Sequence, residues 1–127
     1  MNSLFNTPGL RAYLECALWS SVDDNDEPFD KNYDLDDIAD STVLQAYKDL
    51  KQIHELADLT CPRWEEFWAI EAFAHDFWLT RCGHGAGYWS RYSDGDAQEI
   101  GQRLSDIAKT FGGLDPVLGD DGLIYFE

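Results

Sequence analysis

The chain has 127 residues, of which 44% are hydrophobic and 14% aromatic, enough for one domain with a substantial buried core. Its 25 acidic and 9 basic residues give a formal net charge of −16. This charge disfavours direct binding to nucleic acid or to an anionic membrane, and it favours a basic protein partner. No run of residues approaches the roughly 20 apolar positions of a membrane span.

The three cysteines, Cys16, Cys61 and Cys82, are widely spaced and form no CxxC pair. Residues 1–7 lack the basic and apolar regions of a signal peptide. Both features predict reduced thiols and a cytoplasmic protein.

Residues 8–21 are predicted to form the first helix. Thr7 fits the N-cap position and Pro8 the first helical position. Apolar residues then recur at helical spacing and predict one buried face, which Trp19 extends. The other members of that face are Leu10, Tyr13, Leu14, Ala17 and Leu18.

An acidic segment follows between residues 23 and 40, where half of the 18 positions are carboxylates and Lys31 is the one base. Its apolar residues are spaced to anchor it on the body of the protein, and residues 35–39 are predicted to form a short helical turn. The anchoring residues are Phe29, Tyr33, Leu35 and Ile38.

Three acids of this segment, Asp24, Asp26 and Asp30, alternate like calcium ligands. An EF-hand loop starting at Asp24 would need glycine where Phe29 stands and glutamate where Leu35 stands, so that motif is absent. An irregular calcium site, a solvated acidic loop and a contact surface for a basic partner remain as interpretations.

A second helix is predicted over residues 41–59, with one apolar face. A third is predicted to begin at Pro62 and to be largely buried or to cover an interface, because aromatic residues such as Trp64 and Trp68 nearly encircle it. Glu65, Glu66 and Glu71 take its outward positions. Near residue 74 the pattern also allows this helix to continue through Trp78.

Residues 75–92 are predicted to form a β-hairpin, because two aromatic arms flank three glycines, Gly83, Gly85 and Gly87. A helix over 97–111 and a second hairpin around residues 119–122 follow. The chain is therefore predicted to be a single α+β domain over residues 1–127. Three helices form its N-terminal half, and two C-terminal hairpins flank a fourth helix and make a small antiparallel sheet.

Catalytic and phosphate-binding motifs are weak. His75 and Asp76 would point to opposite faces of a strand, so they would not form a dyad. The glycine-rich residues 83–87 are not followed by Lys and Ser or Thr, as a phosphate-binding loop requires. Thr80, Ser90 and Ser93 have no nucleophile motif around them.

A zinc site would draw on Cys61, His75, Cys82 and His84, but their spacing does not match the common structural zinc patterns. His84 is instead expected to hydrogen-bond backbone groups in its glycine turn. The sequence thus predicts a protein that is not an enzyme and that needs no cofactor or metal.

The block from His75 to Arg81, followed by Gly83-His84-Gly85-x-Gly87-Tyr88-Trp89, resembles a family of small acidic proteins encoded by bacteriophages. The similarity covers residues 75–126, including the turn Gly119-Asp120-Asp121-Gly122, and residues 13–21 are similar too. The family pattern has Asn where this chain has Cys82. Functions in the family are mostly unassigned, so the resemblance implies a phage origin and a bacterial host cytoplasm rather than a reaction.

Charge and resemblance together predict a phage-type inhibitor that presents DNA-like negative charge to a nucleic-acid-binding bacterial defence protein, either a CRISPR effector or a restriction enzyme. One alternative is a protein-interaction or assembly module, monomeric or homodimeric, that binds through exposed aromatics. A small hydrolase or metal-dependent enzyme is the third interpretation. The predicted contact residues are Asp23, Asp24, Asp26, Glu27, Asp30, Asp34, Asp36, Asp37, Asp40, Glu65, Glu66 and Glu71.

Overall fold

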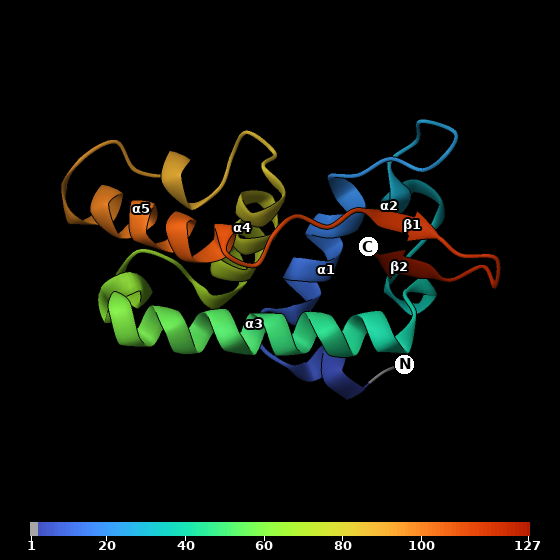
Figure 1. Ribbon diagram of the computed structural model, residues 1–127, viewed down its shortest axis with the longest axis horizontal. Coiled ribbons are helices and arrows are strands. Elements are labelled where there is room, and N and C mark those ends of the chain that lie inside the picture. Colours follow the sequence, from blue (N-terminus) through green and yellow to red (C-terminus); the bar gives the residue numbers. More distant parts are fainter. Residues whose placement is uncertain (1–2) are drawn as a thin grey trace.

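A computed structural model describes residues 3–127, so Met1 and Asn2 of the amino-terminal segment lie outside the described residues. The described chain is mostly helical and carries one small two-stranded antiparallel sheet (Figure 1). Its elements, in which η marks a 3₁₀ helix, are η1 (Ser3–Asn6), α1 (Leu10–Trp19), α2 (Phe29–Asn32), η2 (Leu35–Asp37), α3 (Asp40–Thr60), η3 (Pro62–Glu66), α4 (Ile70–Cys82), η4 (Tyr88–Ser90), α5 (Gly95–Lys109), β1 (Pro116–Leu118) and β2 (Ile124–Phe126).

The long helix α3 lies along one side of the molecule, α1 and α5 pack beside it, and α4 packs on α1 and α5 (Figure 1). The most extensive contact between elements is that of α1 with α4. The acidic segment and the β1–β2 hairpin lie near the amino-terminal end of α3, and η3 and the start of α5 lie near its carboxyl-terminal end.

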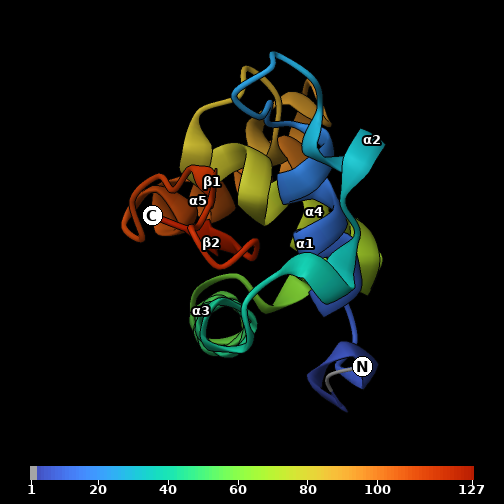
Figure 2. The same ribbon diagram turned by 90° about the vertical axis from the view of Figure 1, so that its right-hand side faces the viewer.

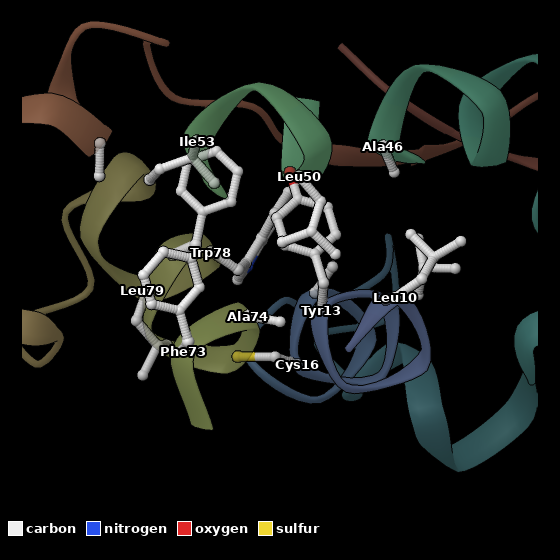
Figure 3. Close-up of a cluster of buried hydrophobic side chains, with 14 of the residues drawn as sticks. Leu10, Tyr13, Cys16, Ala46, Leu50, Ile53, Phe73, Ala74, Trp78 and Leu79 are labelled. Atoms are coloured by element: carbon white, nitrogen blue, oxygen red, sulfur yellow. The ribbon is translucent and has the colours of Figure 1, made fainter. Parts of the chain in front are cut away.

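The core lies where α1, α3 and α4 meet, and Figure 3 shows their side chains converging there. Tyr13 of α1 contacts two rings of α4, with centroid distances of 5.4 Å to both Phe77 and Trp78. Leu50 and Ile53 of α3 close the other side and are almost fully buried. Aromatic contacts of this kind add about 0.5–1.5 kcal/mol each beyond the burial of area.

The first predicted hairpin is wrong, because residues 77–81 belong to α4 and residues 88–90 form η4. Helix α4 is buried on nearly every side, so its apolar residues show no helical periodicity and its short aromatic run looks like a strand. The helix ends at Gly83, whose φ of 69° is left-handed, as glycine at a helix terminus allows.

The predicted third helix is also divided. Pro62 starts only the short helix η3, and α4 begins after a break at residues 67–69. Trp64 and Trp68 are 3% and 4% exposed, so both lie in the core rather than at an interface.

Other predictions of helices are confirmed with small shifts. The predicted helices 41–59 and 97–111 correspond to α3 and α5, and the predicted turn at 35–39 contains η2. The first helix begins at Leu10 with Gly9 as its N-cap, so the roles predicted for Thr7 and Pro8 are wrong. Trp19 is 59% exposed and does not extend the buried face.

The second predicted hairpin is confirmed, with β1 and β2 paired from Pro116 opposite Phe126 to Leu118 opposite Ile124. It is the one sheet within residues 3–127. A Cβ atom at Gly101 would lie 2.6 Å from the carbonyl oxygen of Tyr88, which is too close for any other residue. Glycine at this position therefore allows helix α5 to approach η4 closely.

Arg81 on α4 is a buried cation that joins four parts of the fold. Its guanidinium donates to the Asp49 carboxylate on α3 at 2.9 Å and to the Tyr13 hydroxyl on α1 at 3.0 Å. It also donates to the carbonyl oxygens of Phe111 and Gly112, which follow α5, at 3.1 and 2.8 Å. The Arg81 side chain is 3% exposed, so these partners replace its hydration.

Replacing this cation should destabilise the fold strongly. We expect Arg81→Met to lower the free energy of unfolding by roughly 3–5 kcal/mol, because it leaves the Asp49 carboxylate without its counter-charge and two carbonyl oxygens without their donor. Urea unfolding followed by tryptophan fluorescence measures the change.

The matched control is Arg103→Met on α5, where the arginine is 58% exposed and lies 3.8 Å from Glu99. This exposed pair contributes little, so the control should unfold nearly as the wild type does. Equal stabilities of the two variants would show that Arg81 does not organise the core.

Candidate functional site

The acidic segment, defined as residues 23–40, is ordered and anchored on the body of the protein, as predicted. Phe29, Leu35 and Ile38 are 1%, 9% and 3% exposed, and Tyr33 is half-buried. Ile38 also forms an isolated bridge to Ile124 of β2, which ties the segment to the hairpin. Figure 2 looks onto this end of the molecule, where the segment and the hairpin lie together.

Three of the nine carboxylates stabilise the backbone of the segment itself. Asp23 accepts a hydrogen bond from the backbone N–H of Glu27 at 3.1 Å and closes a turn. Asp34 and Asp37 form a reciprocal capping box around η2, in which Asp34 accepts from the N–H of Asp36 at 2.9 Å. These three side chains shape the segment and are not all available to a partner.

Other carboxylates of the acidic segment face solvent. Asp24, Asp26, Asp30, Asp36 and Asp40 are exposed. Asp26 adopts a left-handed backbone conformation with a φ of 59°, which a turn of this kind accommodates at an Asp residue. Local neutralisation is small, because Lys31 pairs with Glu27 at 2.9 Å and is the only base in the segment.

Two of the three glutamates predicted as extensions lie elsewhere, whereas Glu71, in the first turn of α4, lines the second groove of the candidate site. Glu65 and Glu66 belong to η3, which follows the carboxyl end of the 21-residue helix α3, whereas the acidic segment precedes its amino end. A helix of that length spans about 30 Å. Glu66 is further engaged by Arg63 at 2.6 Å, so the twelve predicted residues do not form one surface.

A groove of about 630 Å³ lies where the acidic segment meets α1 and α4, and we call it the acidic groove. Asp30, Asp34 and Asp36 line its rim. Trp19 and His75, whose ring centroids are 6.1 Å apart, line it from α1 and α4. Trp19 is thus an exposed aromatic ring beside several carboxylates.

A second groove of about 540 Å³, the apolar groove, lies on the other side of His75. Phe67, Trp68, Glu71, Ala72 and Tyr92 line it. Tyr92 is 38% exposed, and its hydroxyl donates to the Phe67 carbonyl oxygen at 2.7 Å. This bond holds the two aromatic residues at the rim in place.

The apolar groove contains an ion pair that was missed in the sequence, between the buried Asp76 carboxylate and Arg91, whose side chain is 40% exposed. Asp76 is 2% exposed and accepts hydrogen bonds from Trp68 Nε1 at 3.0 Å and Arg91 Nε at 2.9 Å. A second guanidinium nitrogen of Arg91 donates to its other oxygen. Because Asp76 and Arg91 are 15 residues apart, no local spacing signals the pair.

The prediction that His75 and Asp76 point apart is wrong, because both lie on helix α4. His75 Nδ1 is 3.4 Å from Asp76 Oδ1, but that carboxylate is already bound by Arg91 and Trp68. The Asp76 carboxylate therefore orients the Trp68 and Arg91 side chains, because both of its oxygens accept hydrogen bonds from these donors.

The remaining catalytic candidates are dispersed. His84 is exposed after the end of α4, and its backbone N–H donates to the Leu79 carbonyl oxygen at 3.1 Å. Thr80 Oγ1 accepts from the Tyr88 N–H, and Ser90 Oγ bonds with the backbone of Gly87. These hydroxyls stabilise the glycine-rich loop rather than converge with a histidine.

Within residues 3–127 no group of three or more His, Cys, Asp or Glu side chains is arranged to hold a metal ion. This range includes the acidic segment and the four residues considered for zinc. In the same range, none of the helices combines the length and apolar character that crossing a membrane requires.

The three thiols are poor nucleophiles in this environment. Burial, reinforced by the negative charge of Asp76, raises the pKa of Cys16 to about 12. Burial also raises the pKa values of Cys61 and Cys82, and the Cys82 thiol donates to the Leu114 carbonyl oxygen at 3.4 Å. Since the thiolate is the reactive form, each cysteine is protected.

Comparisons with known proteins found no matching family model, no similar curated protein and no similar solved structure. The resemblance to the phage family therefore stays a prediction, and the proposal below depends on the geometry of the acidic segment and its grooves.

Thiol labelling provides a direct check of these environments. At pH 8 iodoacetamide should modify the folded protein at least about a hundredfold more slowly than the guanidinium-unfolded chain, because a raised pKa leaves little thiolate. Half-buried Cys82 should react before buried Cys16. Peptide mass spectrometry measures the order, and rapid labelling of Cys16 in the folded protein would contradict its pKa of about 12.

Proposed function

We propose that the protein binds a basic, nucleic-acid-binding protein through the acidic segment and thereby competes with nucleic acid. The observation that supports this most is the combination of order and exposure in residues 23–40. Buried Phe29 and Leu35 anchor the segment, while Asp24, Asp26, Asp30 and Asp36 stay exposed. Carboxylates on a backbone anchored in this way lose less conformational entropy on binding than those of a disordered acidic tail would.

Competition follows from the electrostatics of nucleic-acid-binding grooves. These grooves hold Lys and Arg that contact phosphates, and their affinity decreases steeply as the salt concentration increases. A protein with a net charge of −16 is attracted to such a groove by the same long-range field. Association should therefore be fast at low salt and strongly weakened at high salt.

The resemblance of residues 75–126 to small phage proteins suggests the setting. In an infected bacterium, an acidic protein that occupies the nucleic-acid groove of a defence enzyme would inhibit it. We therefore propose CRISPR effectors and restriction enzymes as the class of target, with the host cytoplasm as the compartment.

A second candidate is a protein-interaction module that recognises an apolar partner or a second copy of the chain. The observation in its favour is the apolar groove, whose wall includes Tyr92, a ring that is 38% exposed. Trp64 and Trp68 do not test this candidate, because their substitution would damage the core.

Neutralising exposed acids tests the proposal. We expect the variant Asp24→Asn, Asp26→Asn, Asp30→Asn and Asp36→Asn to lose at least tenfold in binding, because these carboxylates face solvent and a partner. The assay captures heparin-binding proteins of a bacterial lysate on the immobilised protein. Capture of DNA-binding proteins by the wild type should be reversed by high salt and by added duplex DNA.

The control neutralises four exposed acids on other elements: Glu55→Gln, Glu65→Gln, Glu99→Gln and Asp106→Asn. Both variants change the formal net charge from −16 to −12, because each removes four carboxylates. The control should retain most of the binding. Equal losses in the two variants, or capture that duplex DNA does not reverse, would contradict competition through the acidic segment.

A further inference from the structure

The acidic groove and the apolar groove meet at shared walls. Ala12 of α1 and His75 of α4 line both of them. The His75 ring lies between the Trp19 ring, 6.1 Å away, and the Asp76 carboxylate, 3.4 Å from its Nδ1. An elongated occupant can therefore cross His75 and contact both grooves at once.

The acidic groove has the charge and the aromatic surface that a guanidinium group prefers. Asp30 and Asp36 line it, and within residues 3–127 neither side chain has an ion-pair partner. The one cation among its lining residues, Arg11, lies 3.9 Å from Glu15. A planar guanidinium can stack on the exposed Trp19 ring while donating to carboxylates, which a lysine ammonium does less well.

The apolar groove offers a surface for an apolar side chain of the same occupant. The Asp76 carboxylate in the wall of this groove is neutralised by Arg91, and the remaining carboxylate of its lining, Glu71, is exposed to solvent. Its aromatic walls are fixed by ring contacts of Tyr92 with Phe67 and Trp68, at 5.8 and 5.3 Å between centroids. An apolar side chain entering here displaces water from a preformed surface and leaves no buried charge unpaired.

We propose that the two grooves form one binding channel for a segment of the partner that presents an arginine next to an apolar side chain. The arginine occupies the acidic groove against Trp19, and the apolar side chain occupies the apolar groove against Ala72. This inference rests on the proposed function, since the same partner supplies the basic surface. It adds that recognition depends on shape and apolar contact as well as on charge.

A substitution at Ala72 separates the two contributions. Ala72 is an exposed position of α4 in the wall of the apolar groove, so Ala72→Glu fills the groove without disturbing the core. The control is Gln52→Glu, at an exposed position of α3 that lines neither groove. Both changes add one negative charge, which by itself would strengthen binding to a cationic probe.

The probe is a short synthetic peptide that alternates arginine and leucine, with matched peptides in which serine replaces leucine or lysine replaces arginine. Affinities come from fluorescence polarisation of the labelled peptides, and near-ultraviolet circular dichroism verifies the fold of each variant. Ala72→Glu should weaken binding of the arginine–leucine peptide at least tenfold, whereas Gln52→Glu should leave it unchanged or slightly stronger. The serine and lysine peptides should bind the wild type more weakly.

Other outcomes would overturn the inference. If Ala72→Glu binds like Gln52→Glu while the fourfold Asp→Asn variant loses binding, charge alone acts and the proposed function survives without the channel. If Ala72→Glu instead dissociates a homodimer in sedimentation velocity, the groove belongs to a second copy of the chain. Absence of peptide binding at millimolar concentration would refute the channel without testing competition at the acidic segment.

Discussion

The buried Arg81 guanidinium is the interaction on which the arrangement of helices depends. Its partners come from α1, α3 and the chain after α5, so a single side chain on α4 fixes three neighbours. The Asp49 carboxylate compensates its charge, and the Phe77 ring lies 5.3 Å from the guanidinium carbon. Because a buried charge tolerates few alternative geometries, this network specifies how α4 is rotated about its axis.

The rotation of α4 determines which residues form the candidate site. With Phe77 and Arg81 directed into the core, Ala72 and His75 lie on the side that lines the grooves. Asp76 lies on that side too, where Arg91 neutralises it beneath the apolar groove. The buried Arg81–Asp49 pair thus sets the helix orientation, and the partly exposed Arg91–Asp76 pair completes the surface that the orientation presents.

The sequence predicted the elements whose apolar residues occupy a single face. Helices α3 and α5 show helical periodicity, and the C-terminal hairpin has an Asp-Gly turn between two short apolar strands. The second half of helix α4 was predicted as a hairpin arm, although the pattern also allowed a helix through Trp78, because burial on almost all sides removes the periodic signal that separates a helix from a strand. The anchoring of the acidic segment was predicted from Phe29, Leu35 and Ile38, whose apolar side chains interrupt the carboxylates.

The candidate site could be predicted only in part, because the amino-acid sequence gives the number of carboxylates but not the direction in which each side chain points. Asp34 and Asp37 cap a turn, Asp76 is buried, and Glu66 lies beyond the far end of α3. The acids available to one partner are therefore fewer than the net charge suggests. Charge of this kind accelerates encounter with any basic surface, whereas discrimination between basic surfaces needs contacts that a wrong partner cannot make. In the proposed channel, the apolar groove, which shares Ala12 and His75 with the acidic groove, would supply such contacts.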